Sequence, residues 1–263
     1  MKLRGWVLAG AVVAPCFGFE TAQAQTRVSF ASGVDYSTGD YGGSTDTELV
    51  SIPLAARISI GTWSFRASVP LLSVTGPADV SDEEAGGGGT ARTGTETGLG
   101  DTTLSVTRAF RNIGDSDFFI DVTGRVRAPT GDEERGLGVG VVDYTAQAQA
   151  GVLTRRASAY ATLGRRFLGD PDAGLDRQDG WLAAIGGWVR AGEKTRVGAS
   201  YTWRNATYDS LDDPSELGGF VSYRASDAVR VSFNLGAGLS DSSPDFRAGL
   251  RFTFEPDLSS GHD

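Results

Sequence analysis

The chain has 263 residues, with 24 lysines and arginines against 33 aspartates and glutamates, and its formal net charge at pH 7 is −9. This acidic balance argues against a nucleic-acid partner, which would need a basic surface. With one cysteine and one histidine, the chain lacks the residues for a disulfide framework or a zinc site, so we predict no cofactor and no bound metal.

The first 24 residues have the features of a secretory signal peptide. Lys2 and Arg4 provide a basic start, Trp6 to Phe19 is an apolar run, and residues 22–24 (Ala-Gln-Ala) match a small-x-small cleavage site. The apolar run is shorter than the ~20 residues that a membrane-spanning helix needs. We therefore expect removal of residues 1–24, export through the inner membrane, and a mature chain that begins at Gln25.

After the signal, the sequence alternates between apolar and polar residues in twelve stretches separated by turn residues. In the third stretch, Trp63, Phe65 and Leu71 share one face, and Arg66 and Ser68 share the other, because successive side chains of a strand point to opposite faces. Stretches of about 10 to 13 residues are longer than usual soluble strands and can cross an outer membrane. The predicted strands are 26–37, 48–60, 62–74, 99–110, 117–129, 141–154, 157–168, 180–190, 195–207, 216–225, 228–239 and 246–254.

The connections alternate between tight turns and longer, mostly acidic loops. The tight turns are 61–62, 111–116, 155–156, 191–194 and 226–227, and the longer connections are 38–47, 75–98, 130–140, 169–179, 208–215 and 240–245. Several acids are expected in these loops, including Glu83, Glu133, Asp172, Asp212 and Glu216. This pattern predicts an all-β fold: an antiparallel transmembrane β-barrel of about 12 strands, with short periplasmic turns and long extracellular loops.

The predicted barrel occupies residues 25–255 and is followed by a polar C-terminal tail, 256–263. Its apolar faces are expected to contact lipid. Trp63, Trp181 and Trp203 lie near strand ends, where an aromatic girdle would form at the membrane surface. The alternative is a soluble β fold in which these aromatic side chains belong to the core.

The opposite faces of the strands carry many arginines, which alternate out of phase with the apolar residues and should line the lumen of the barrel. One interpretation is a positively biased pore that favours anions. The other is that arginine–carboxylate pairs fill and brace a narrow barrel. The predicted lumen-lining residues are Arg57, Arg66, Asp121, Arg125, Arg127, Arg166, Arg196, Arg204, Arg224, Arg230, Arg247 and Arg251.

The sequence offers little for catalysis. Its histidine, His262, lies in the polar tail, where no rigid surroundings can orient it as a general base, so we do not expect an enzyme. Acidic loop segments such as Asp170-Pro171-Asp172 could supply oxygen ligands for a divalent cation. The same residue types are ordinary turn formers, so these loops predict no metal site.

Several segments, some in loops and some on or beside the predicted strands, carry distinctive sequences. They are residues 32–43, Val69-Pro70-Leu71-Leu72, residues 98–102, Ala128-Pro129-Thr130-Gly131-Asp132 through the glycine run 136–140, and residues 238–245. With these segments the chain resembles the outer-membrane family named for the meta-cleavage pathway of phenol degradation, although Ala128 and Val139 depart from the family pattern. The resemblance implies a barrel and a role in the passage of small, often aromatic or hydrophobic, compounds.

Together these observations predict a protein of the outer membrane of a Gram-negative-type cell. The expected function is a channel or facilitator for passive uptake or efflux of small solutes, either aromatic or hydrophobic compounds or anions. The alternative is a non-transporting structural or surface-binding barrel with a plugged lumen. The expected partners are outer-membrane lipid and lipopolysaccharide, a small-molecule solute, and the barrel-assembly machinery during biogenesis.

Overall fold

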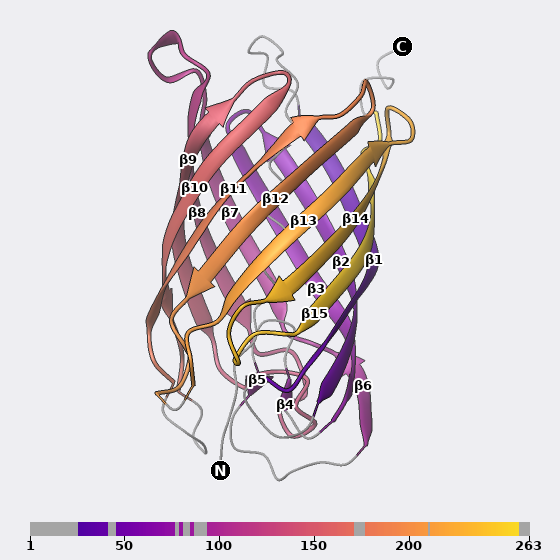
Figure 1. Cartoon of the computed structure of the whole chain (residues 1–263), viewed down its shortest axis with the longest axis vertical. Helices are drawn as coiled ribbons and strands as arrows, with labels where there is room; N and C mark the ends of the chain where they lie inside the picture. Colours follow the sequence, from indigo (N-terminus) through magenta and orange to yellow (C-terminus); the bar gives the residue numbers. More distant parts are fainter. Residues whose placement is uncertain are drawn as a thin grey trace.

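The computed structural model describes residues 26–41, 46–76, 79–80, 85–86, 94–170, 177–209 and 211–257. The predicted signal peptide and residues 258–263 of the predicted tail, with His262, lie outside the described residues. The long strands form the wall of one barrel (Figure 1). They are β1 (Thr26–Gly39), β2 (Thr47–Ile60), β3 (Trp63–Thr75), β6 (Thr95–Leu99), β7 (Thr102–Phe110), β8 (Phe118–Ala128), β9 (Asp143–Leu153), β10 (Ala157–Phe167), β11 (Gly180–Arg190), β12 (Thr195–Arg204), β13 (Ser215–Arg224), β14 (Val229–Gly238) and β15 (Phe246–Phe254).

Each strand pairs antiparallel with its neighbour in the chain, and β15 pairs with β1 to close the sheet. Since β6 and β7 share one position beside β3, the wall has twelve strands, and the predicted antiparallel barrel is confirmed. Phe30 lies opposite Phe254, so the start of β1 and the end of β15 are at the same end of the barrel. We call this the turn end, because the tight turns are there, and the opposite end the loop end.

Two small elements lie in the connections. The pair β4 (Asp79–Val80) and β5 (Ala85–Gly86) forms a short hairpin in the loop after β3. The 3₁₀ turn η1 (Ile113–Asp115) lies between β7 and β8. Among the described residues, no helix is long and apolar enough to cross a membrane.

The prediction of one continuous strand over 99–110 is wrong, because the wall is interrupted between β6 and β7. β3 pairs with β7 as far as Ser68 opposite Thr103, and with β6 from Leu71 opposite Leu99. Across the gap, the Gly100 N–H donates to the carbonyl of Pro70 at 2.9 Å. Pro70 has no N–H to return a bond, so the regular pattern of paired bonds cannot continue at this point.

The outside of the barrel is apolar. Ile185 is 60% exposed, and Phe30 and Leu54 are 50% exposed, all at outward positions of their strands. An apolar surface of this extent is stable only when lipid covers it. The barrel therefore spans a membrane, and the predicted phase of its strands is confirmed.

Trp63 and Trp181 lie on this outer surface at opposite ends of the barrel. Trp63 begins β3 at the turn end, and Trp181 lies near the start of β11 at the loop end. The Arg108 guanidinium lies 4.9 Å from the Trp63 ring centre, and Arg165 lies 5.3 Å from that of Trp181. Aromatic rings paired with arginine suit the two boundaries between lipid and water.

Candidate functional site: the barrel lumen

The lumen is the candidate site because the wall turns its polar faces inward. Along β8, Val122 is 48% exposed on the outside, whereas its neighbour Asp121 is only 6% exposed. The same alternation places each predicted lumen-lining residue on the inward face of its strand. They differ in exposure: Arg127, Arg166, Arg204 and Arg247 are buried, whereas Arg224 is exposed.

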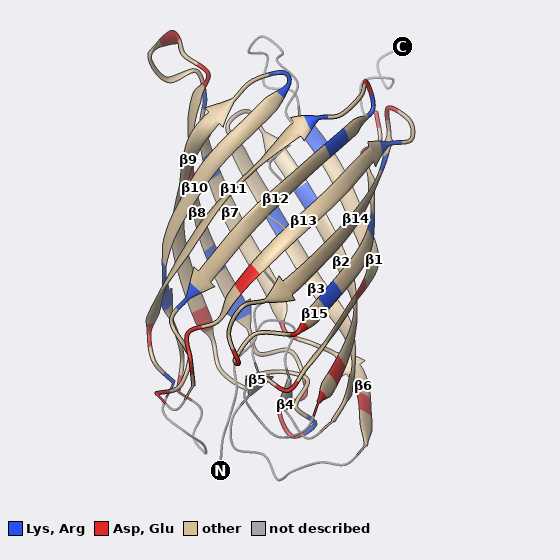
Figure 2. Ribbon diagram, viewed as in Figure 1, with Lys and Arg blue, Asp and Glu red and all other residues tan. Residues whose placement is uncertain are grey.

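Four of these arginines belong to one row of directly opposite residues that crosses six strands. Arg57 faces Arg66, Arg66 faces Ser105, and Ser105 faces Arg125. The row continues from Arg125 through Thr145 to Arg166. Strands of a barrel tilt against its axis, so the row climbs from the turn end at Arg57 to the loop end at Arg166. Figure 2 shows positive segments distributed along the strands in this way.

A charge network at the loop end centres on Asp143, the first residue of β9. Arg177 holds this carboxylate with two bonds of 2.8 Å, one to each oxygen, and Arg127 bonds to Oδ2 as well. The Gly169 N–H adds a fourth bond of 2.9 Å. Arg177 comes from the loop before β11, so the carboxylate fixes that loop against the inner wall.

Three further carboxylates pair with lumen arginines. Asp35 is 3.2 Å from Arg251, and Glu216 is 3.4 Å from Arg247. Glu216, grouped with the loop acids although the predicted strand 216–225 begins with it, lies on β13 and is 6% exposed. At the turn end, Asp121 pairs with Arg111, with one bond of 3.0 Å between Nη2 and Oδ2.

Sequence reasoning missed Arg111 and Arg177 as lumen partners, because neither lies in a strand. Arg111 lies in the turn after β7, and Arg177 lies among the acids of a long loop. Arg177 has a weak signal in hindsight, since it is an isolated arginine in a loop that is otherwise acidic. Nothing local indicates that it folds back 34 positions to Asp143.

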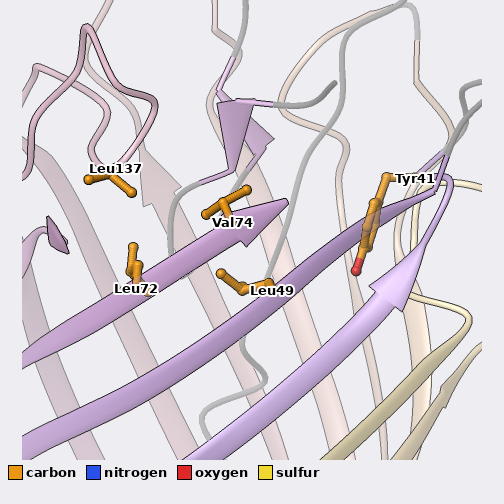
Figure 3. Close-up of a cluster of buried hydrophobic side chains, with 5 residues drawn as sticks. All are labelled: Tyr41, Leu49, Leu72, Val74 and Leu137. Carbon is orange, nitrogen blue, oxygen red and sulfur yellow. The ribbon is translucent and has the colours of Figure 1, made fainter. Parts of the chain in front are cut away.

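An apolar cluster closes part of the loop end. Tyr41, Leu49, Leu72, Val74 and Leu137 are buried together on the inside of β2 and β3 (Figure 3). Leu137 comes from the connection between β8 and β9, which therefore folds inward over the lumen. Burial raises the pKa of the Tyr41 phenol, so this ring stays neutral.

The inward fold of this connection explains two of the distinctive sequence segments. The Asp101 carboxylate, at the interruption between β6 and β7, accepts bonds from the Gly131 N–H at 2.9 Å and from the Val139 N–H at 3.0 Å. Position 138 must be a glycine, because the Cβ of any other residue would lie 2.6 Å from Oδ1 of Asp101. Asp101 thus fixes both arms of the loop that carries Leu137.

Aromatic side chains also face the lumen, which the sequence analysis did not predict. Tyr160 and Trp188 occupy inward positions on β10 and β11. A Cβ at Gly186 would lie 2.6 Å from the Tyr160 hydroxyl, so the glycine leaves room for this ring against the wall. The signal was present in the sequence, because Trp188 is in phase with Arg190 two residues later.

The loop end is acidic outside the wall. Loss of hydration, followed by the like charges of Asp40, Asp46 and Asp241, raises the pKa of the Asp245 carboxyl above its ordinary value. Within the part of the chain that the structure describes, no group of three or more histidine, cysteine, aspartate or glutamate side chains could hold a metal ion. Much of the predicted loop 169–179, with residues 171–176, lies outside that part.

The family model described as "Putative MetA-pathway of phenol degradation" matches residues 21–255. The chain belongs to this family. Among solved structures, it is similar to an outer-membrane channel from Pseudomonas putida F1, with a TM-score of 0.66, 17% identity, and coverage of 91% of this chain and 99% of that one. It is also similar to the KdgM porin, with a TM-score of 0.53, 10% identity, and coverage of 86% and 98% respectively. No curated protein matches the sequence.

These similarities support the fold and not a particular solute. Together with the apolar exterior, they place the barrel in the outer membrane, as predicted. The resemblance noted in the sequence to the phenol-degradation family is confirmed by the family match.

Proposed function

We propose that this protein is an outer-membrane channel through which small solutes pass passively. The observation that supports this proposal best is the contrast between the two faces of the wall. The outside is an apolar belt, whereas the inside carries arginines, carboxylates and hydroxyls around the whole circumference. A polar lumen inside an apolar barrel is the arrangement that carries hydrophilic solutes across an outer membrane.

Within this proposal, the preferred solutes are small organic anions, including aromatic acids. The eleven predicted lumen-lining arginines outnumber the four carboxylates that pair with lumen arginines, Asp35, Asp121, Asp143 and Glu216, in a chain that is acidic overall. Rings of arginine favour anions in a pore. Tyr160 and Trp188 add apolar surface that an aromatic solute can contact. Its lipid partners would include lipopolysaccharide at the loop end, and its insertion would depend on the barrel-assembly machinery.

A second candidate is a non-transporting structural or surface-binding barrel. It is favoured by the buried cluster at the loop end, where Leu137 belongs to the same apolar cluster as Leu72 on the inner face of the wall. It is also favoured by the ion pairs of Asp143 and Glu216, which brace the wall without needing any solute. In this case the protein would conduct no ions at any applied potential.

Single-channel recording in planar bilayers separates the two functions. A conducting wild type with a reversal potential that favours anions supports the channel. Arg125→Glu and Arg230→Glu should weaken the anion preference, and salt should reduce the effect without abolishing it. Arg108→Glu is the control, because Arg108 lies on the outside over Trp63 and should leave selectivity unchanged. A closed lumen or a cation-selective wild type would favour the structural interpretation of the arginines.

A further inference from the structure

A cavity of about 90 Å³ lies at the turn end of the lumen, between the ends of β11 to β14. Its cationic lining residues are Arg190, Lys194, Arg196, Arg224 and Arg230, and its acidic lining residue is Glu193. A chain with a net charge of −9 thus gathers five positive side chains around one small space. Positive segments gather where these strands reach the turn end, at the top of the view in Figure 2.

The strand register places like charges directly opposite one another in this cavity. Arg190 on β11 faces Arg196 on β12, and Arg224 on β13 faces Arg230 on β14. Opposite positions of neighbouring strands bring the Cβ atoms within about 4.5–5.5 Å, where like charges destabilise the sheet. The fold places two such pairs on adjacent strands, and an anion held between them would reduce their mutual repulsion.

At the loop end, carboxylates pair with the lumen arginines: Asp143 bonds to Arg127 and Arg177, and Glu216 pairs with Arg247. Among the described residues, no ion pair joins Arg190, Lys194, Arg224 or Arg230 to a carboxylate. The bracing interpretation, which accounts for the arginines at the loop end, therefore does not account for these four.

Two side chains, Arg196 and Ser222, provide hydrogen-bond donors at defined positions in the cavity. The Arg196 guanidinium lies 4.4 Å from the centre of the Trp188 ring, which fixes its direction. Ser222, opposite Arg196, accepts a bond from the Ser232 hydroxyl at 2.9 Å. Since Ser222 is the acceptor in that bond, its own hydroxyl hydrogen can be donated into the cavity. Guanidinium groups and a hydroxyl donor are the groups that bind carboxylate and phosphate oxygens.

We propose that this cavity is an oxyanion-binding site that holds the carboxylate or phosphate group of a small solute at the turn end of the lumen. The space fits such a group, since a single water needs only about 10–15 Å³. The proposal deepens the proposed channel function and rests on it for its biological role, because it names the class of solute that the lumen would hold. The binding itself requires only the folded barrel.

Calorimetric titration of the refolded mature chain in detergent tests the site. The probes are inorganic phosphate and benzoate, each at one fixed ionic strength, so that general screening stays constant. Wild type should bind at least one probe saturably. The double variant Arg224→Gln/Arg230→Gln should weaken that binding at least about tenfold, since it removes two charged donors that face each other across the cavity. Comparison of the two probes distinguishes a carboxylate from a phosphate preference.

Arg155→Gln/Arg156→Gln is the matched control, because it removes the same charge from an exposed turn at the same end of the barrel. The dissociation constant of this control variant should lie within about twofold of the wild-type value, a change of less than about 0.5 kcal/mol. Arg224→Lys provides a second variant that keeps the charge but loses the fork geometry, and it should bind more weakly than wild type and more tightly than the double variant. Heat-modifiable migration on gels confirms that each variant folds.

The results separate this site from the channel function. No saturable binding of either probe, or equal losses in the control and the double variant, would overturn the site. Planar-bilayer recording on the same preparations tests the channel independently. Conduction without binding would refute the proposed site and support the channel function. Binding without conduction would support the site and refute the channel function.

Discussion

The Asp143 carboxylate offers the most direct test of the charge network in the lumen. Its side chain is 6% exposed, and those of its partners Arg127 and Arg177 are 5% and 2% exposed. Asp143→Asn keeps the volume of the side chain but removes the charge and turns one acceptor oxygen into an NH₂ donor. Two buried guanidinium groups then face a donor where they had an acceptor.

The expected cost is large, because an arginine that loses its buried partner retains an uncompensated charge. Breaking a buried ion pair in this way costs about 3–5 kcal/mol. In the wild type, the Gly169 N–H donates to Asp143 Oδ1 at 2.9 Å, and the amide oxygen of the asparagine can still accept this bond. We therefore expect a loss of free energy of unfolding in the lower part of this range. Urea unfolding of the barrel in lipid vesicles, followed by tryptophan fluorescence, measures the difference in the free energy of unfolding.

Asp179→Asn is the control, because Asp179 pairs with Arg165 at 4.0 Å with both side chains more than a third exposed. An exposed pair contributes only about 0–1 kcal/mol. The double variant Asp143→Asn/Arg177→Gln should cost less than the sum of its single variants, since it removes the charge that the first change leaves unpaired. Equal losses for the Asp143 and Asp179 variants, or strict additivity, would refute the network.

Three further predictions concern the wall and the loop end. Val122→Arg, on the lipid face, should lower the free energy of unfolding by about 2–4 kcal/mol, whereas Thr123→Arg, one residue later on the lumen face, should fold nearly normally in the same urea assay. Leu137→Ala should loosen the apolar cluster and raise single-channel conductance; an unchanged conductance would mean that this loop does not constrict the lumen. The raised pKa of Asp245, which reflects lost hydration and charges such as Asp40, makes the folded loop end more stable when this carboxyl is protonated. That stability is present at acid pH and is lost as the pH rises through the raised pKa. The protection factors of the neighbouring amides, which correct for the intrinsic rate of hydrogen exchange, should therefore rise on acidification in wild type but less in Asp245→Asn.

The alternation of residue types was enough to predict which face of each strand meets lipid. Val122 and Asp121 are neighbours, and a period of two sends them to opposite sides of the wall whatever the rest of the chain does. The same argument found the inward arginines, including Arg125 and Arg230. The lengths of the strands and the alternation of short and long connections then made a closed antiparallel barrel the natural architecture.

Partners across the lumen could not be predicted, because they depend on strand register and barrel closure. Asp35 meets Arg251 across a separation of 216 positions, and Arg177 reaches Asp143 from a loop. The interruption at Gly100 could not be predicted either, because Asp101 takes its role only when the loop that carries Leu137 folds inward.

The sequence by itself determined the fold class, the phase of the strands and the inward placement of the arginines, because these follow from a local period of two. Only the tertiary structure decided which arginines are neutralised and which are crowded together. The closed sheet brings Arg247 on β15 within 3.4 Å of Glu216 on β13, whereas it sets Arg224 directly opposite Arg230. The energy of a charge depends on what lies within a few ångströms of it, and the closed sheet, not the local sequence, sets those neighbours.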